Sequence, residues 1–223
     1  MKLLTANKKL EKSTPGYRIL GLALAPYNFS GVTNVCPWAG ECAKKCIWTS
    51  GLNAIPAAKN SKIAKTQYFA ANRALFISQL DAEITVEKIR AQRDGLKLAV
   101  RLNLYSDIVW DAIARELFER HLDVIFYDYT KRPSKLGMNL PENYSLTYSL
   151  NEKTTEQEFQ SWMAIANVAA VFAVKRGEAL PSHFKGYPVI DGDIHDARFL
   201  DKQGVIVGLR AKNGLKDSAF IAA

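Results

Sequence analysis

The stretch LKLAVRLNLYSDIVWDAIARELFER, residues 96–120, holds the pattern that decides the fold. Residues 96–105 are largely apolar and predict a buried strand, whereas residues 109–120 predict a helix. The polar residues Asn103, Ser106 and Asp107 stand where the strand gives way to the helix. A strand that leads through a polar turn into a helix is the repeating unit of α/β folds with a parallel sheet.

The same unit recurs along the chain. Further strands are predicted at residues 17–26, 124–130, 144–150, 168–175, 187–191 and 205–212. Helices are also predicted at 57–93 and 154–166, the second with Thr154 or Thr155 as its N-cap. About seven strands are fewer than the eight of a full barrel. We therefore expect one α/β domain over residues 1–223, with a largely parallel sheet shaped as a small or incomplete (β/α) barrel.

The composition fits a globular domain. Of the 223 residues, 48% are hydrophobic and 23% are charged, which is enough for a substantial core. No apolar run approaches the ~20 residues of a membrane span, and residues 1–18 lack the apolar core of a secretory signal. An odd number of cysteines argues against a disulfide framework, so we expect a reducing, cytoplasmic setting. Because no membrane span is predicted, we expect no membrane partner.

The formal net charge of +8 predicts attraction to an anionic partner. The lysines and arginines are spread along the chain, and no zinc-finger, helix-turn-helix or RNP pattern is present. A Walker A motif, a Rossmann glycine pattern and a nucleophile elbow are also missing from the sequence. Nucleic-acid binding therefore stays open, beside the simpler alternative of a basic surface.

Polar residues follow nearly every predicted strand, at the carboxyl edge where α/β folds place their sites. As catalytic residues we expect Asp107, Asp128, Lys131 and Asp191. As substrate-binding residues we expect Arg101, Asn103, Ser106, Lys175, Asp193, Arg210 and Lys212. Simpler roles remain open: a helix cap at Ser106 or Asp107, turn formation by Asp191 and Asp193, and pairing of Arg101 and Arg210 with aspartates. Lys131 and Arg132 together could hold an anionic group, or Lys131 could lie in solvent.

All the cysteines lie in NVCPWAGECAKKC, residues 34–46, within a loop (27–50) that follows the first strand. Three interpretations compete: incidental thiols, a zinc site completed by His121, His183, His195 or a carboxylate, and a [4Fe-4S] cluster. We favour the cluster, because three thiolates hold three irons and leave the fourth iron to a small molecule or a non-cysteine ligand. The predicted metal ligands are Cys36, Cys42 and Cys46.

Six segments in order carry a resemblance to a known family: GLALAP, NVCPWAGECAKKC, VRLNLYSDIVWD, VIFYDYTKRP, NYSLTYSLNE and VIDGDIHDARFLD. Over residues 7–216 the chain resembles a bacteriophage protein family with a radical-SAM-like core. The resemblance implies a TIM-barrel-like fold and an iron–sulfur cluster on the cysteine triplet. The spacing here is C-x5-C-x3-C, whereas the radical-SAM superfamily has C-x3-C-x2-C. Ser106 and Asp107 stand where that superfamily carries a Gly-Gly-Glu-like motif for S-adenosylmethionine.

These observations favour an enzyme that uses a [4Fe-4S] cluster with an open iron in hydrolase- or lyase-type Lewis-acid chemistry. We expect a small-molecule substrate, an anionic one included, and location in the host cytoplasm if the gene belongs to a phage. One alternative is a radical-SAM enzyme with S-adenosylmethionine as a further cofactor. The other is a non-catalytic zinc or iron–sulfur module that binds nucleic acid or a host protein.

Overall fold

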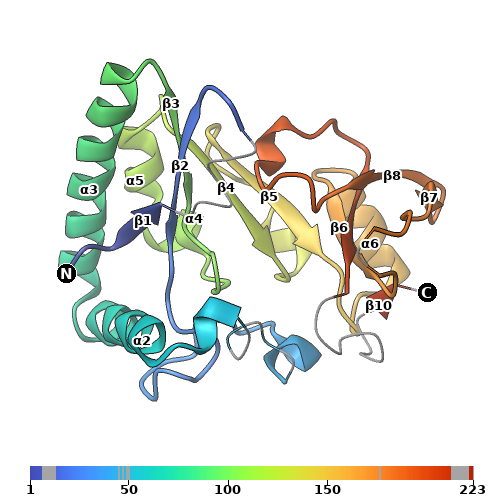
Figure 1. Ribbon diagram of the computed structural model, residues 1–223, viewed down its shortest axis with the longest axis horizontal. Helices are drawn as coiled ribbons and strands as arrows, with labels where there is room; N and C mark the ends of the chain where they lie inside the picture. The colour runs from blue at the N-terminus through green and yellow to red at the C-terminus, as the bar shows by residue number, and fades with distance from the viewer. Residues whose placement is uncertain are drawn as a thin grey trace.

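The computed structural model describes residues 1–6, 14–44, 46, 48, 51–175, 177–211 and 221–222. One sheet organises these residues, with the strand order β1-β2-β3-β4-β5-β6-β9-β8-β7 (Figure 1). The strands are β1 (Leu4–Ala6), β2 (Tyr17–Leu22), β3 (Lys97–Arg101), β4 (Ile125–Thr130), β5 (Tyr144–Ser149), β6 (Val168–Phe172), β7 (His183–Phe184), β8 (Tyr187–Asp191), β9 (Ile206–Arg210) and β10 (Ile221–Ala222).

The sheet is largely parallel and unclosed. Strands β2 to β6 are neighbours in chain order and run parallel, and β9 and β8 continue in the same direction. Only β1 and β7 pair antiparallel with their neighbours among the described strands, while β10 adds to β6 in parallel. Within the described residues no pairing joins β7 back to β1. The predicted α/β class and largely parallel sheet are therefore confirmed.

Two helices predicted as continuous are each divided in the structure. The predicted helix 57–93 is α2 (Pro56–Ala71) followed by α3 (Arg73–Arg93), and 109–120 is α4 (Trp110–Ile113) followed by α5 (Arg115–Arg120). Asn72 separates α2 from α3 with φ −151° and ψ 79°, and its side chain accepts the backbone N–H of Leu75. An asparagine side chain competes with the helical backbone in this way, and the periodicity of the apolar residues does not reveal it.

The helix predicted at 154–166 is shorter, α6 (Glu156–Met163). Its N-cap is Thr155, whose hydroxyl accepts the backbone N–H of Glu158 at 3.1 Å. Short 3-10 helices complete the chain: η1 (Gly40–Ala43), η3 (Gly51–Ala54), η4 (Ser134–Leu136) and η5 (Arg198–Leu200).

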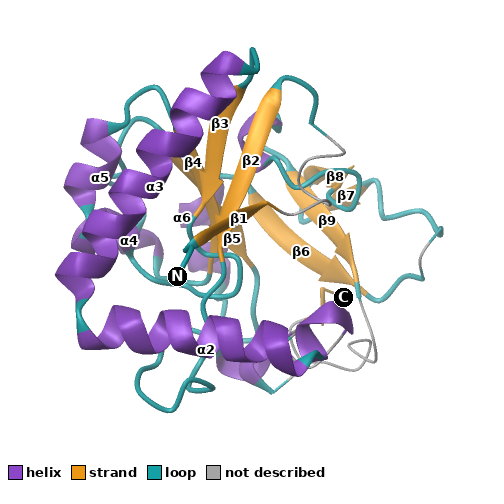
Figure 2. Ribbon diagram, turned by 60° about the vertical axis from the view of Figure 1, so that its left-hand side comes forward, coloured by secondary structure: helices purple, strands orange, loops and turns teal. Residues whose placement is uncertain are grey.

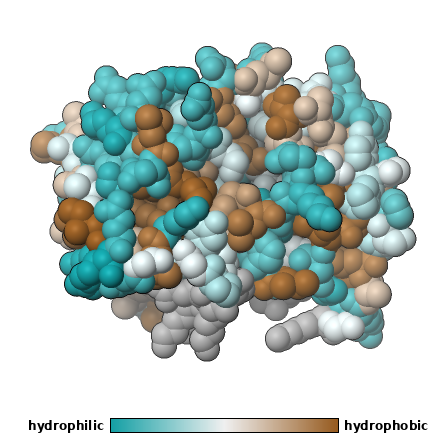
Figure 3. Space-filling view, turned by 90° about the horizontal axis from the view of Figure 1, so that it is seen from above, coloured by the Kyte–Doolittle hydropathy of each residue, from teal (hydrophilic) through white to brown (hydrophobic). Residues whose placement is uncertain are grey.

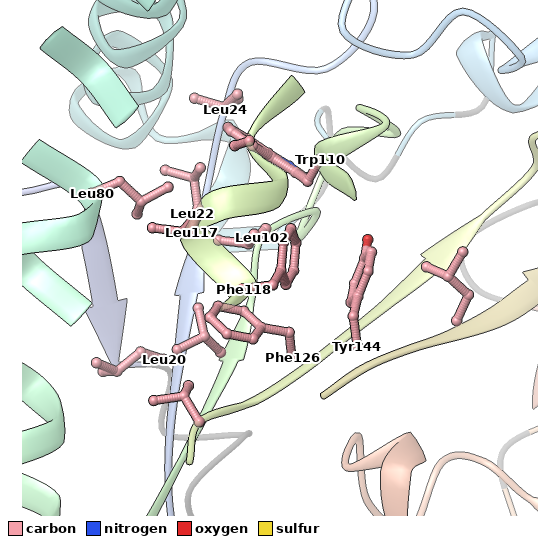
Figure 4. Packing of buried hydrophobic residues seen from close by; sticks show 14 of the residues in the cluster. Leu20, Leu22, Leu24, Leu80, Leu102, Trp110, Leu117, Phe118, Phe126 and Tyr144 are labelled. Carbon is pink, nitrogen blue, oxygen red and sulfur yellow. The ribbon is translucent and has the colours of Figure 1, made fainter. Parts of the chain in front are cut away.

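The helices α3, α4 and α5 lie together on one face of the sheet (Figure 2). Apolar side chains from β2, β4, β5 and these helices point toward one another there (Figure 4). Phe118 lies at the centre, with its ring centroid 4.7 Å from those of both Phe126 and Tyr144. Residues so fully buried contribute about 1.5–3 kcal/mol each through removal of apolar surface from water.

The other face of the sheet carries a smaller cluster of Ile19, Ala99, Tyr127 and Ala197. Phe199 of η5 packs against it, with its ring 5.1 Å from that of Tyr127. The chain around η5 therefore covers the face that a closed barrel would turn inward.

The surface seen from above mixes hydrophilic and hydrophobic residues (Figure 3). Among the described helices, none has both the length and the apolar character needed to cross a bilayer.

Candidate functional site

The cysteine loop (residues 27–50) follows β2 and is fastened to the turn after β3. The backbone N–H of Asp107 donates to the carbonyl of Val35 at 2.8 Å. The Sγ of Cys36 donates to the carbonyl of Tyr105 at 3.3 Å and accepts the backbone N–H of Tyr27 at the same distance. Because β2 and β3 are parallel, these bonds hold the loop at the carboxyl edge of the sheet, in the lower part of Figure 1.

Burial and neighbouring thiols act together on the pKa of cysteines in the loop. Each cysteine is half-buried. Burial raises the pKa of Cys36 to about 12 and also raises the pKa of Cys46, and the neighbouring Cys42 adds to both shifts. A bound cation reverses this balance, because positive charge favours the thiolate form that ligates metals.

Asp107 links the end of β3 to the end of β4. Its Oδ1 accepts the hydroxyl of Thr130 at 2.7 Å, and its Oδ2 accepts the backbone N–H of Lys131 at 2.8 Å. Burial raises the pKa of the carboxyl, and these two hydrogen bonds oppose the shift. In the described structure Val109 is the N-cap residue of α4 and no side chain caps that helix, so Ser106 and Asp107 do not act as caps.

Lys131 follows β4 and lies near two carboxylates and the thiol of Cys42. Its Nζ donates to the hydroxyl and carbonyl oxygens of Ser149 at 2.8 and 3.3 Å. Burial lowers the pKa of Lys131, while the nearby Cys42, Asp107 and Glu152 oppose that shift. The lysine therefore offsets negative charge between the cysteine loop and the ends of β4 and β5.

A cavity of about 340 Å³ opens beside Lys131, between the cysteine loop and the ends of β4 and β5. Its walls combine rings with cationic and polar groups, among them Trp38, Lys131, Tyr148, Asn151, Lys153 and Thr155. Glu158 also lines it, but the Glu158 carboxylate is bound by the backbone N–H and hydroxyl of Ser134. The wall therefore carries two lysines and one carboxylate, and its net positive charge suits a small anion.

Asp128, predicted as catalytic, is fully buried behind the edge. Its Oδ1 accepts the backbone N–H of Asn103 at 2.7 Å and its Oδ2 accepts the hydroxyl of Tyr144 at 3.0 Å. Burial raises the pKa of Asp128 to about 7. The side-chain oxygen of Asn103 accepts the hydroxyl of Ser106 at 2.8 Å and the N–H of Ile108 at 3.0 Å. Asp128, Asn103 and Ser106 thus hold the strand ends in place, and none of them lines the cavity described above.

A second group of predicted residues lies elsewhere on the sheet. Both carboxylate oxygens of Asp191 accept Arg210 Nη1 at 2.9 Å, and Asp193 accepts the backbone N–H of Arg210 at 3.0 Å. In the strand order, β8 is four places from β4, on the order of 20 Å at the ~4.8 Å spacing of neighbouring strands. Lys175, after β6, is exposed. Lys212 lies outside the described residues.

Two arginines expected near an anion are instead paired with aspartates. Arg101 Nη1 lies 2.7 Å from Asp196 Oδ2, and its guanidinium lies 4.8 Å from the ring centroid of Tyr129. Arg132 makes a bidentate pair with Asp111, at 2.7 and 3.2 Å. Of the pair Lys131 and Arg132, only Lys131 therefore reaches the cavity.

The histidines considered as zinc ligands have other surroundings. His121 Nε2 lies 2.7 Å from Asp81 of α3. His195 Nδ1 lies 3.1 Å from Arg198 Nη2, beside η5. His183 belongs to β7, at the end of the sheet order.

The sequence reasoning missed Glu152 and the cavity rings of Trp38 and Tyr148. Glu152 Oε1 accepts the backbone N–H of Glu41 at 3.0 Å, directly before Cys42. Its signal was available, because Glu152 follows the predicted strand 144–150 on the same polar edge as Asn151.

Comparisons with known proteins bear on the family of the chain. No curated protein and no solved structure is similar to it. A family model described as Gene product 88 matches residues 1–223. The match agrees with the resemblance to a phage-type protein family, and the radical-SAM-like core stays a prediction. The chain belongs to the Gene product 88 family.

Proposed function

We propose that the protein is an iron–sulfur enzyme. In this proposal Cys36, Cys42 and Cys46 hold a [4Fe-4S] cluster, and a small anionic substrate binds in the cavity beside Lys131. One observation carries it: every thiol of the chain stands in a single loop at the carboxyl edge of the sheet, and a cavity opens between that loop and two strand ends. Sites of α/β folds lie at this edge.

The donor set suits a cluster, because cysteine thiolates are the usual ligands of iron–sulfur clusters. Among the described residues, no three histidine, cysteine, aspartate or glutamate side chains lie close enough to share one metal ion. Each thiolate of a cubic cluster binds a different iron, so its ligands stand farther apart than those of one ion. Cys42 and Cys46 both raise the pKa of Cys36, which supports a shared centre in this proposal.

A cluster held by three thiolates supplies a Lewis-acidic iron, which suits hydrolase- or lyase-type chemistry. The residues of the chain do the rest. Lys131 and Lys153 attract and orient an anionic substrate, because both lysines lie on the cavity wall. Asp107 keeps Lys131 in place through the backbone N–H of that lysine. Trp38 and Tyr148 narrow the space left for water.

A radical-SAM enzyme is the second candidate. The consecutive parallel strands β2 to β6, with the cysteine loop directly after the first of them, favour an incomplete (β/α) barrel of that type. At the end of β3, however, Asp107 already accepts two hydrogen bonds where that superfamily offers a glycine-rich motif. Formation of deoxyadenosine from S-adenosylmethionine under reducing conditions would support this second candidate over hydrolysis.

The deciding experiment measures iron, zinc and acid-labile sulfide after anaerobic purification, together with the visible spectrum. We expect about four iron and four sulfide per wild-type chain, and loss of both in Cys42→Ala. Val32→Ala is the matched control, since Val32 is an exposed apolar residue of the same loop. Stoichiometric zinc without sulfide would overturn the cluster and favour a non-catalytic module, which a salt-dependent affinity for nucleic acid would identify.

A further inference from the structure

Glu152 reaches from the segment after β5 into the cysteine loop. Its Oε1 accepts the backbone N–H of Glu41, and Glu41 directly precedes Cys42. Its Oε2 is buried and accepts no hydrogen bond from any residue that the structure describes. Buried polar atoms almost always have a partner, and an ionised one without a partner is strongly unfavourable. This oxygen therefore indicates a missing positively charged or donor group.

The loop is shaped to admit this carboxylate. Gly40 has φ +52°, and a Cβ at that position would lie 2.1 Å from Glu152 Oε1 and 3.3 Å from Oε2. Any side chain at Gly40 would therefore occupy the space that the carboxylate now fills. The close approach of Glu152 to the loop depends on a glycine two residues before Cys42.

The other acidic groups around the loop already have partners. The Glu41 carboxylate pairs with Lys44 Nζ at 2.7 Å. Both oxygens of Asp107 accept hydrogen bonds, and so do both oxygens of Glu158. Among these four carboxylates, Glu152 alone has a buried oxygen that no described group satisfies.

We propose that Glu152 is the non-cysteine ligand of the metal centre. Its Oε2 binds the iron that no thiolate binds. Carboxylate oxygen is a common ligand of non-haem iron. The nearby Lys131 offsets the added negative charge. This inference rests on the proposed function and refines it, because it names the ligand of the iron that no thiolate binds.

The test compares wild type with Glu152→Gln, whose amide keeps an oxygen for the N–H of Glu41 but is a weaker iron ligand. After anaerobic reconstitution with iron and sulfide, mild oxidation converts a cluster with a labile fourth iron into a three-iron form that electron paramagnetic resonance detects. We expect this conversion to be at least about 10-fold faster in Glu152→Gln, as loss of supporting groups at metal sites lowers affinity by that order or more. Glu156→Gln, an exposed acid of α6 paired with Lys185, is the matched control and should behave as wild type.

A second measurement separates ligation from folding. Without metal, Glu152→Gln should unfold at the same temperature as wild type or a higher one, because it replaces a carboxylate whose Oε2 is buried without a partner. With the cluster bound, wild type should unfold at a higher temperature than Glu152→Gln. Equal oxidation rates in wild type, Glu152→Gln and Glu156→Gln would overturn the ligand assignment and leave the cluster standing. A wild-type protein without iron and sulfide would instead overturn the proposed function, and this assignment with it.

Discussion

Asp107 Oδ2 accepts the backbone N–H of Lys131 at 2.8 Å, and this bond joins the turn after β3 to the end of β4. The backbone N–H of the same aspartate donates to Val35 in the cysteine loop. One residue therefore positions both the segment that carries the thiols and the lysine that faces the cavity. A change at Asp107 is expected to affect stability as well as the site.

We predict that Asp107→Ala lowers the free energy of unfolding of the metal-free protein by about 3 kcal/mol. The substitution leaves the buried hydroxyl of Thr130 and the N–H of Lys131 without their acceptor, at roughly 1–3 kcal/mol for each. Urea unfolding followed by circular dichroism measures the change. Asp123→Ala, which removes an exposed partner of Lys88, should change the value by about 1 kcal/mol at most. Equal effects of the two substitutions would contradict the bracing role of Asp107.

The pH dependence of stability should report on Asp128. Burial raises its folded-state pKa to about 7, above the 3.8 of an unperturbed aspartate. The folded state therefore binds the proton more tightly between these values, and stability falls as pH rises through this range. The contribution of Asp128 is complete below about pH 4 and is lost as pH passes about 7.

Asp128→Asn tests that prediction, because an amide replaces the titrating carboxyl with nearly the same shape. The free energy of unfolding of the metal-free wild type should fall more between pH 5 and pH 8 than that of the variant. Arg101 Nε, 4.0 Å from Asp128, works in the opposite direction by favouring the charged carboxylate. Identical pH profiles would show that Arg101 compensates for burial completely.

Gly40 and Gly51 offer a matched pair of glycines. Both have positive φ, +52° and +57°, but a Cβ at Gly51 would meet nothing within 4 Å whereas one at Gly40 would meet Glu152. Gly40→Ala should lower the unfolding free energy by about 2 kcal/mol more than Gly51→Ala. The reason is that the new Cβ displaces Glu152 from its hydrogen bond to the backbone N–H of Glu41, and a hydrogen bond to a charged group contributes about that much. Thermal unfolding of both metal-free variants measures the difference. Equal effects would mean that backbone strain explains both.

The buried pair of Asp111 and Arg132 should be sensitive to the loss of one partner. The side chain of Arg132 is 2% exposed, and Asp111→Ala leaves its guanidinium without a carboxylate partner. Removing one partner of a buried ion pair lowers the free energy of unfolding by about 3–5 kcal/mol. Replacing both residues, Asp111→Leu with Arg132→Met, should restore most of the stability. The exposed pair of Arg115 and Glu119 provides the control, with an expected effect of about 0.5 kcal/mol. A double variant as unstable as Asp111→Ala would contradict this account.

The sequence predicts the repeating strands and helices because apolar periodicity follows directly from burial. It does not predict the break at Asn72, since a local side-chain hydrogen bond decides that break against the periodicity. It also does not reveal β1, because three residues, Leu4–Ala6, are too few to show a pattern. The position of β9 between β6 and β8 depends on contacts between distant segments, which spacing along the chain does not encode.

The candidate site was predicted as far as backbone direction determines it. The cysteine loop and Lys131 lie at the carboxyl edge because parallel strands bring their ends together. The sequence does not predict which side chains become partners. Asp128 accepts a hydrogen bond from Tyr144 inside the core, and Asp191 accepts one from Arg210 at the far end of the sheet. In the sequence, both aspartates look like residues of the carboxyl edge. Charge pairs between distant segments form only in the folded chain. The sequence alone therefore does not distinguish carboxylates that stabilise the fold from carboxylates that face the cavity.

The place of β9 has a consequence for the newly made chain. Among the described strands, β9 is the last long one to be synthesised, yet it pairs with β6 on one side and β8 on the other. Until Arg210 has left the ribosome, β6 exposes the edge that β9 later covers, and β8 has only the two-residue strand β7 as a described neighbour. Exposed strand edges invite pairing with other chains. Nascent chains that stall before residue 206 should therefore be prone to association, and the cysteine loop is complete long before the sheet that supports it.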